Sequence, residues 1–391
     1  MGPGFVIAAT SIGAGSVVSF SNAGSNFGYQ LTWWLIVMGI FVFAFNYAMR
    51  KFTIVTGLTI QEGINKYFGK GWAMVVAICA MISQTVYGIG NFIAVGLGFM
   101  LLFPGLPLWV GGAIGFVACV IMYILKNIYK KAEIVTKICV FVMAVLFIVS
   151  LCATFGISDD VVVSTSVIGI PQGSFAVMLA LFGTTASLAT QAWATSLCKD
   201  KGYVIEDIKA VRVDTIIQVV ATIGLSACFM FVGAKLLPGQ PIQNAGGLAN
   251  ALVGVFGAWI RPVFGIGFLA AAWSSQIMAP KLGTDFLFEA LGKKDKEMTM
   301  NIVNIIMLAV GGVIAIAVGG IPTQLLTLAQ IGGVINTPIL GILTIILLCR
   351  KDIMKEHKIK LPYIIGICIV FAVCMVVIVN NVINIIGSIG A

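Results

Sequence analysis

The sequence contains few charged residues. Asp, Glu, Lys and Arg make up 9% of its 391 positions, hydrophobic residues make up 60%, and the mean hydropathy is +1.09. A soluble globular domain is roughly 25% charged, so this composition excludes that class of protein. Apolar runs that can form about 20 helical residues, the length that crosses a bilayer core, recur along the whole chain. We therefore predict an all-α integral membrane protein with eleven transmembrane helices in one transmembrane domain, residues 1–391.

Residue types that usually hold metals or catalyse reactions are scarce. The one histidine, His357, lies in a basic loop before the last predicted helix, and the nine cysteines show no Cys-x-x-Cys spacing. These patterns argue against a zinc site and a disulfide framework. The stretch Gly13-Ala14-Gly15 is not followed by the Lys-Ser/Thr of a phosphate loop, and no predicted strand precedes it. We expect no catalytic residues, no enzyme activity and no cofactor.

The basic residues occur in alternate connections between the predicted helices. They follow the second, fourth, sixth, eighth and tenth apolar runs, whereas the intervening connections contain only Lys235 and Arg261, with Asp159 and Asp160 as the only acidic residues there. Cytoplasmic loops carry the excess of Lys and Arg, so we place the N-terminus in the cytoplasm and the C-terminus outside a cell membrane. The net charge of +9 therefore reflects topology, and we expect the lipid bilayer as a partner and no nucleic acid. A signal peptide is not expected, since a basic n-region and a cleavage site are missing.

Two predicted helices are interrupted near their centres. The first, about residues 4–24, contains Gly13-Ala14-Gly15-Ser16, and the sixth, about residues 173–198, contains Gly183-Thr184-Thr185-Ala186-Ser187. Backbone that leaves the helix at membrane depth is tolerated only where it is buried in protein or lines a cavity. Glycines in one membrane helix more often indicate close packing, but a break in two helices at matching positions indicates a substrate site.

The spacing of the two breaks predicts the internal organisation. Because the two broken helices are five positions apart in helix order, we expect two inverted five-helix repeats, residues 1–156 and 172–349, followed by an extra helix over residues 361–385. The tenth helix contains Gly332-Gly333 and Pro338 and is expected to bend. The eighth helix, about residues 257–279, is expected to end before Pro280.

Polar side chains on otherwise apolar helices complete the candidate site. Gln84, Tyr87 and Asn91 form one stripe on the third helix, which either lines a pathway or hydrogen-bonds to neighbouring helices. We predict that the substrate contacts the two breaks and the tenth helix, at Gly13, Ala14, Gly15, Ser16, Thr184, Thr185, Ser187 and Asn336. The pathway is predicted to contain Gln84, Tyr87, Asn91, Gln191 and Gln330.

Several segments resemble the Nramp family of divalent-metal transporters. They are distributed over essentially the whole chain and comprise Gly2-Pro3-Gly4-Phe5, Asn26-Phe27-Gly28-Tyr29, Ile54-Val55-Thr56-Gly57, Asp207 to Asp214, Ala271 to Gln276, and Leu328-Ala329-Gln330 through Pro338. The resemblance implies the leucine-transporter-type 5+5 inverted-repeat fold with broken helices 1 and 6. It also implies a substrate site between these two breaks.

The sequence departs from the Nramp pattern at the positions that carry its chemistry. Gly13 to Ser16 stand where the family has Asp-Pro-Gly-Asn, and Ser187-Leu188-Ala189 stand where it has Met-Pro-His. An acidic pair on the third helix falls on Gly88 and Asn91, and a glutamine on the tenth helix is Asn336. The chain resembles a divergent branch near the Nramp-related magnesium transporters, which also lack the methionine but keep the carboxylate of the first helix.

These departures limit what the site can bind. We place all fourteen acidic residues in loops or at helix ends, so the site offers neutral oxygens, and removing an ion from water costs several kcal/mol. A dehydrated transition metal is therefore not expected, and no metal ligand set is assigned. By resemblance we expect alternating-access transport of a divalent cation, Mg²⁺ before Mn²⁺ or Fe²⁺, as a hydrated ion, without proton coupling because intramembrane acids are missing.

Two alternatives of other classes fit the same residues. Free helix ends in this type of transporter can bind the charged groups of a small neutral or zwitterionic organic solute. A receptor or scaffold that keeps the fold without transporting is the third possibility, because a fold does not by itself determine a function.

Overall fold

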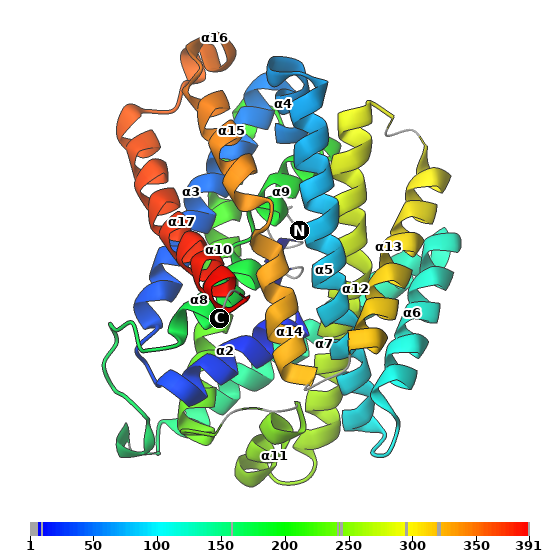
Figure 1. The fold of residues 1–391 in the computed structure, drawn as a ribbon, viewed down its shortest axis with the longest axis vertical. Helices are drawn as coiled ribbons and strands as arrows, with labels where there is room; N and C mark the ends of the chain where they lie inside the picture. The colour runs from blue at the N-terminus through cyan, green and yellow to red at the C-terminus, as the bar shows by residue number, and fades with distance from the viewer. Residues whose placement is uncertain are drawn as a thin grey trace.

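The computed structural model describes residues 7–8, 11–157, 159–240, 242, 245–293, 296–318 and 322–389, and all the regular secondary structure in these residues is helical. The segment Gly2-Pro3-Gly4-Phe5 lies outside the described residues. Most helices run along one common direction, and α4 and α16 lie at the opposite end of the bundle from α11 (Figure 1). The elements in chain order are α2 (Ala14–Phe27), α3 (Thr32–Thr56), α4 (Ile60–Phe68), α5 (Lys70–Leu102), α6 (Leu108–Ile124), α7 (Lys126–Thr154), α8 (Ser174–Thr185), α9 (Leu188–Asp200), α10 (Ile208–Leu236), α11 (Ala245–Phe256), α12 (Ile260–Leu291), α13 (Glu297–Val318), α14 (Pro322–Ile331), α15 (Thr337–Cys349), α16 (Lys351–Met354) and α17 (Leu361–Ile389).

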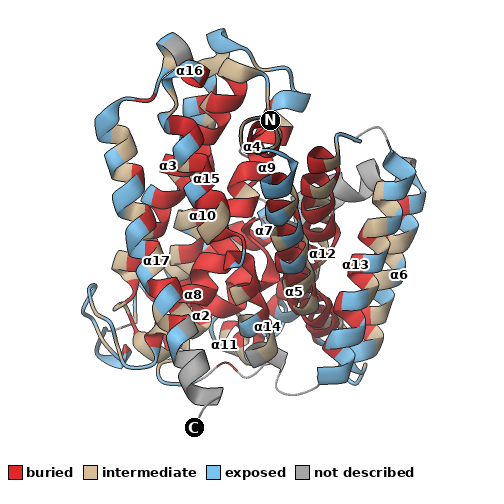
Figure 2. Cartoon of the chain, turned by 45° about the horizontal axis from the view of Figure 1, so that its top comes forward, coloured by how far each residue is buried: buried red, intermediate tan, exposed pale blue. Residues whose placement is uncertain are grey.

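The all-helical membrane class is confirmed. Eight helical segments of the described chain are long and apolar enough to cross a membrane, and three shorter apolar helices accompany them. Buried residues gather in the middle of the bundle around α2, α8 and α9, whereas α6, α13 and α17 expose much of their surface (Figure 2). Because these exposed surfaces carry isoleucine and valine, they suit contact with lipid. The count of eleven crossings stays a prediction.

The first predicted break is confirmed at Ile12–Gly13. Gly13 is extended, with φ −98° and ψ 174°, and α2 begins at the next residue, Ala14. The residue lies close to α12, since a Cβ there would lie 2.5 Å from Ser275 Oγ and would force that hydroxyl to move. Ala14, Gly15 and Ser16 thus belong to the first turn of α2 rather than to the irregular segment.

The second predicted break is confirmed at Ala186–Ser187. The helix α8 ends at Thr185, and α9 begins at Leu188 after Ser187 takes φ −46° and ψ 122°. The carbonyl groups of the last turn of α8 therefore lack partners within that helix. They place the partially negative end of a helix at the break.

The tenth predicted helix is also interrupted, as expected. The short 3-10 segment Gly332–Val334 separates α14 from α15. A Cβ on Gly333 would lie 2.2 Å from the Gly183 carbonyl oxygen, and a Cβ on Gly183 would lie 2.0 Å from the Gln330 carbonyl oxygen. The backbones of α8 and the tenth-helix break thus touch directly, which only glycine permits.

The predicted end of the eighth helix is wrong. The helix α12 continues through Pro280 to Leu291, although proline removes one backbone donor and usually kinks or ends a helix. Asp285 and Glu289, which we expected in a loop or at a helix end, therefore lie within α12, and both are buried. The tertiary contacts described below explain why this extension is stable.

Candidate functional site

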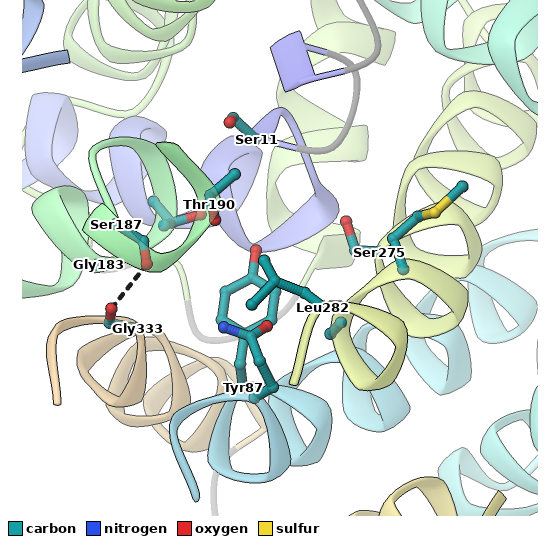
Figure 3. A pocket seen from close by; sticks show the side chains of 12 residues that line it. Ser11, Tyr87, Gly183, Ser187, Thr190, Ser275, Leu282 and Gly333 are labelled. Carbon is teal, nitrogen blue, oxygen red and sulfur yellow. Dashed lines mark hydrogen bonds between the residues drawn. The ribbon is translucent and has the colours of Figure 1, made fainter. Parts of the chain in front are cut away.

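A small cavity lies where the two breaks meet α5 and α12. It measures about 20 Å³ and is lined by Ser11, Gln84, Tyr87, Gly183, Thr184, Ser187, Thr190, Ser275, Met278, Ala279, Leu282 and Gly333. This volume suits about one water molecule. Figure 3 shows Tyr87 reaching from α5 into the space between α9 and α12. Six different helical segments thus contribute to one site.

Ser16 connects the two breaks directly. Its hydroxyl donates to the Ser11 carbonyl oxygen at 2.9 Å and lies 2.8 Å from Thr184 Oγ1. Because the single proton of Ser16 is used for Ser11, Thr184 is the donor in the second hydrogen bond. Both side chains are at most 5% exposed, so this contact fixes α2 against α8 in a setting that excludes water.

Ser187 connects the second break to the tenth-helix break. Its position before α9 would allow the side chain to cap that helix, but no capping bond forms. The hydroxyl instead donates to the Gly333 carbonyl oxygen at 2.8 Å (Figure 3). The residue therefore serves tertiary contact rather than the local stability of its own helix.

Tyr87 and Ser275 form the opposite wall. The Tyr87 hydroxyl lies beside the hydroxyl groups of Thr184 and Ser275, and Gly13 borders both Tyr87 and Ser275. The Ser275 side chain is 1% exposed, and its oxygen has no hydrogen-bond partner among the described residues. A buried hydroxyl without a partner costs about 1–3 kcal/mol, so a water molecule or an ion at this position would stabilise it.

The structure brings together only some of the residues that the sequence singled out. Gln84, Tyr87, Thr184 and Ser187 line the cavity. Gly13 borders it through Ser275, and Ser16 contributes by holding Thr184. The remaining predicted residues are absent from the lining, namely Ala14, Gly15, Thr185, Asn91, Gln191, Gln330 and Asn336.

These remaining residues are buried among other helices. Gly15 packs on Gln330, whose amide would lie 2.3 Å from an added Cβ. Gln191 accepts from Asn46 at 3.0 Å and from Gln218 at 3.1 Å. The side-chain amide of Asn336 is completely buried and has no partner among the described residues.

Sequence reasoning missed several lining residues. Ser11 and Thr190 lie beside the two breaks, whereas Ser275, Met278 and Leu282 lie on the continuous helix α12. The polar step Ser274-Ser275-Gln276 was visible in the eighth apolar run and is the one signal that could have indicated Ser275. Nothing in the spacing of the others distinguishes them from packing residues.

The described cavity wall carries no carboxylic acid and no imidazole. Its twelve described residues offer hydroxyl, amide and carbonyl oxygens, together with one thioether from Met278. No group of three or more His, Cys, Asp or Glu side chains that could hold a metal occurs in the described part of the chain. Any cation in this cavity would therefore be bound by neutral oxygens.

Two buried carboxylates lie further along α12. Trp193 Nε1 donates to Asp285 Oδ2 at 2.8 Å, and Glu289 accepts from Ser196 and Thr59, both at 2.7 Å. These contacts tie the end of α12 to α9 and to the start of α4. They supply the tertiary stabilisation that carries α12 past Pro280, and sequence reasoning missed them because the partners are far apart in the chain.

The cavity and its breaks occur in a chain that matches known transporters. The family described as "Natural resistance-associated macrophage protein-like", Nramp, matches residues 4–384. The "Divalent metal cation transporter MntH" of Caldanaerobacter subterraneus subsp. tengcongensis is 22% identical over 368 residues, covering 91% of this chain and 86% of that protein. The "Uncharacterized membrane protein YcsG" of Bacillus subtilis is 26% identical over 366 residues, covering 92% of this chain and 87% of that protein.

Solved structures agree with the fold. The Eremococcus coleocola manganese transporter, crystallised with an aromatic bis-isothiourea substituted compound, has a TM-score of 0.73 at 17% identity and covers 95% of this chain and 85% of its own. MhsT in complex with L-phenylalanine has a TM-score of 0.59 at 16% identity, with 96% and 97% covered. At these identities the likeness concerns the fold alone.

Proposed function

The chain belongs to the Nramp family of membrane transporters, and from this premise we propose that it moves a divalent cation, Mg²⁺ before Mn²⁺ or Fe²⁺, by alternating access. The relatives named as divalent metal transporters support the cargo class. The family match supports transport over a receptor or scaffold. We choose between an ion and an organic solute from the volume of the central cavity and from the residues that line it.

The volume of the cavity favours an ion. Pockets that hold organic ligands measure roughly 300–1,000 Å³, whereas this cavity measures about 20 Å³. An atomic cation of about the size of one water molecule fits this space, and an amino acid does not. The C-terminal end of α8 and the hydroxyl oxygens of Thr184, Ser187 and Tyr87 place partial negative charge beside the space.

The type of ligand favours a hard cation. Magnesium prefers oxygen ligands and usually keeps several waters, while imidazole and thiolate select transition metals. The hydroxyl and amide oxygens of the lining suit magnesium, and the Met278 thioether is the one soft atom in the described lining. We therefore rank Mg²⁺ above Mn²⁺ and Fe²⁺.

We propose that transport proceeds without proton coupling. The described lining contains no carboxylate or histidine that could exchange a proton with the cargo site. Asp285 and Glu289 accept from indole and hydroxyl groups on α9 and α4, a role in holding helices together. The proposal assigns them no part in proton transfer.

The proposal includes the organisation of the chain. Residues 1–156 and 172–349 are the two inverted repeats, and residues 361–385 form the extra helix. The broken helices lie at the interface of the repeats, where transporters of this architecture bind substrate near the membrane midplane. The N-terminus is cytoplasmic and the C-terminus is outside, as the basic loops indicate.

Flux into proteoliposomes tests the proposal. The purified full-length chain is reconstituted with an internal magnesium or manganese indicator, and Mg²⁺, Mn²⁺, Fe²⁺ and a panel of amino acids and amines are added in turn. We expect Mg²⁺ entry above that of empty liposomes, with less Mn²⁺ and Fe²⁺ entry. Thr184→Val is expected to lower this flux, and Thr344→Val, which removes a buried hydroxyl of α15 that does not line the cavity, serves as the matched control.

Two outcomes contradict the proposal. Uptake of an organic solute without any metal signal would replace the cation by the organic alternative. A pH-sensitive dye inside the same liposomes reports on coupling, and acidification that depends on the metal would refute uncoupled transport.

A further inference from the structure

A second, much larger cavity lies at the end of the bundle opposite the basic loops. It measures about 480 Å³, which is within the range of roughly 300–1,000 Å³ for small-molecule pockets. The ends of α7 and α10, the α2–α3 connection and the segment that follows α7 form it. Its lining residues are Tyr29, Thr32, Leu151, Thr154, Phe155, Ile157, Asp159, Val167, Phe231 and Lys235.

The cavity contains opposite charges side by side. Lys235 Nζ lies 2.7 Å from Asp159 Oδ1 and 2.5 Å from the Ile157 carbonyl oxygen. The Tyr29 hydroxyl donates to the same Asp159 oxygen at 3.1 Å. Lys235 and Asp159 are also among the few charged residues that the sequence places in these connections, and the fold has gathered them in one cavity.

Lys235 and Asp159 can each form a further hydrogen bond with a ligand. An ammonium group has three donors, and the two contacts named above use two of those of Lys235. Both side-chain contacts of Asp159 use Oδ1, and 61% of its side chain is exposed, so Oδ2 can accept from a ligand. The site is thus complementary to a molecule that carries an anionic and a cationic group close together.

Three aromatic side chains line the same cavity as the carboxylate. Tyr29 and Phe231 meet edge to face with their ring centres 5.3 Å apart, and Phe155 lines the same cavity while 75% exposed. Ring faces attract ammonium groups within about 6 Å. An ammonium that meets Asp159 would therefore also meet aromatic surface, which favours a zwitterion with a cationic end over a simple anion such as free phosphate.

The surroundings of the cavity are apolar and exposed. Val167, Ile168 and Ile170 in the segment after α7 are 54%, 73% and 58% exposed, and Trp33 Nε1 donates to the Gly169 carbonyl oxygen at 2.8 Å. Tryptophan and exposed apolar residues at the end of membrane helices are typical of the headgroup region. On α7, the exposed residues Val145, Ile148 and Val149 lead to the cavity and offer a surface for acyl chains.

We propose that this cavity binds the headgroup of a zwitterionic phospholipid in the membrane leaflet opposite the basic loops. The phosphate lies at the Lys235 ammonium, and the ammonium of the headgroup lies at Asp159 among the rings of Tyr29, Phe155 and Phe231. The acyl chains lie along α7. The bound lipid connects the ends of α7 and α10 and does not depend on the cargo of the central site.

Native mass spectrometry of the full-length protein in detergent tests this site. The probes are dioleoyl phosphatidylethanolamine, dioleoyl phosphatidylglycerol and soluble glycerophosphoethanolamine. We expect phosphatidylethanolamine to bind about tenfold more tightly than phosphatidylglycerol, a difference of about 1.4 kcal/mol. Soluble glycerophosphoethanolamine is expected to bind weakly, because it lacks the chains.

Substitutions separate the site from general lipid adhesion. Asp159→Asn, Lys235→Met and Phe155→Ala are each expected to weaken phosphatidylethanolamine binding about tenfold. Phe155→Ala should fold as the parent chain does, because this side chain is 75% exposed. Asp160→Asn, beside the cavity but outside its lining, is the control and should bind as the parent chain does. Equal binding of both lipids, an equal loss in Asp160→Asn, full retention in Phe155→Ala, or tight binding of the soluble headgroup would each overturn the proposal.

Discussion

Ser16 and Thr184 are 168 residues apart in the sequence, and their hydroxyl groups share a hydrogen bond of 2.8 Å. This bond joins the first turn of α2, just after the first break, to the last turn of α8, just before the second break. Because Ser16 also donates to Ser11 on the far side of the first break, one side chain holds both sides of an interrupted helix. The cavity of the proposed cargo site forms around this contact.

Removing the Thr184 hydroxyl tests the contact. Thr184→Val keeps the shape of the side chain and leaves Ser16 without its donor, so we expect the free energy of unfolding to fall by about 1 kcal/mol. Cation flux below saturation should fall about tenfold, the effect of about 1.4 kcal/mol at a binding site. Thermal unfolding in detergent and liposome flux are measured together, with Thr344→Val as the control.

The Thr344→Val control decides whether a loss of flux in Thr184→Val is specific to the contact with Ser16. Thr344 is completely buried and its hydroxyl has no partner among the described residues, so its replacement by valine should leave flux unchanged. If both valine variants lose flux equally, the loss reflects general damage to buried hydroxyl groups, and the role given to Thr184 is wrong.

Glycine at position 183 is expected to be irreplaceable. A Cβ there would lie 2.0 Å from the Gln330 carbonyl oxygen, so Gly183→Ala forces α8 away from the tenth-helix break and should destabilise the protein by about 1–3 kcal/mol. Gly224→Ala on α10 is the matched control, because no heavy atom lies within 4 Å of its added Cβ. That change should stabilise the helix by about 0.5–1 kcal/mol, and equal melting temperatures for the two variants would contradict the packing described above.

The bond between Trp193 and Asp285 is expected to stabilise the extension of α12. Trp193→Phe removes the indole donor and keeps an aromatic ring, so the buried carboxylate loses one hydrogen bond and unfolding should become about 2 kcal/mol easier. Trp72→Phe, at a side chain that is 51% exposed, should have little effect. Hydrogen exchange of residues 281–291 locates the change, and unaltered exchange there would show that this contact does not hold the end of α12.

The cluster of Asp159, Lys235 and Tyr29 predicts a dependence of stability on pH. The hydrogen bond from Lys235 holds the pKa of Asp159 below its usual value of 3.8, so its contribution is present above that value and is lost as the pH falls through the lower folded pKa. Burial, together with the hydrogen bond to Asp159, raises the pKa of Tyr29 from 10.0 to about 12. The contribution of Tyr29 is thus present below pH 10.0 and is lost as the pH rises toward about 12.

Melting temperatures across pH test this cluster. The difference between the parent chain and Asp159→Asn should be largest at intermediate pH, because the carboxylate is then charged and the phenol protonated. It should shrink in acid, where Asp159 is neutralised, and in strong base, where Tyr29 ionises. A difference that stays constant from acid to base would show that the ion pair and the phenol do not contribute in the folded state.

The breaks were predictable because they depend on local composition. Glycine and serine at residues 13–16, and threonine and serine at 184–187, weaken a helix wherever they occur in an apolar run, and the structure interrupts both helices within one or two residues of those positions. The same holds for Gly332-Gly333. The lining residues Ser11, Thr190 and Leu282 were not predictable, since which face of a helix meets a cavity depends on its neighbours.

The helix that contains Asp285 and Glu289 shows most clearly where prediction from local sequence signals fails. Pro280 is a local signal for a helix end, and local signals were all that the sequence offered there. The indole of Trp193 and the hydroxyl groups of Ser196 and Thr59 override it through hydrogen bonds to the two carboxylates. Burial of these acids is therefore a consequence of long-range contact.

The sequence by itself determined the class of protein, the positions of the helix breaks and the loss of carboxylates from the interrupted segments. These properties follow from hydropathy, helix propensity and residue identity, which act over a few turns of chain. Only the tertiary structure decided that Ser16 meets Thr184, that Lys235 meets Asp159, and how small the central cavity is. Such contacts join residues far apart in the chain, and their free energies depend on shapes that exist only after the helices have packed.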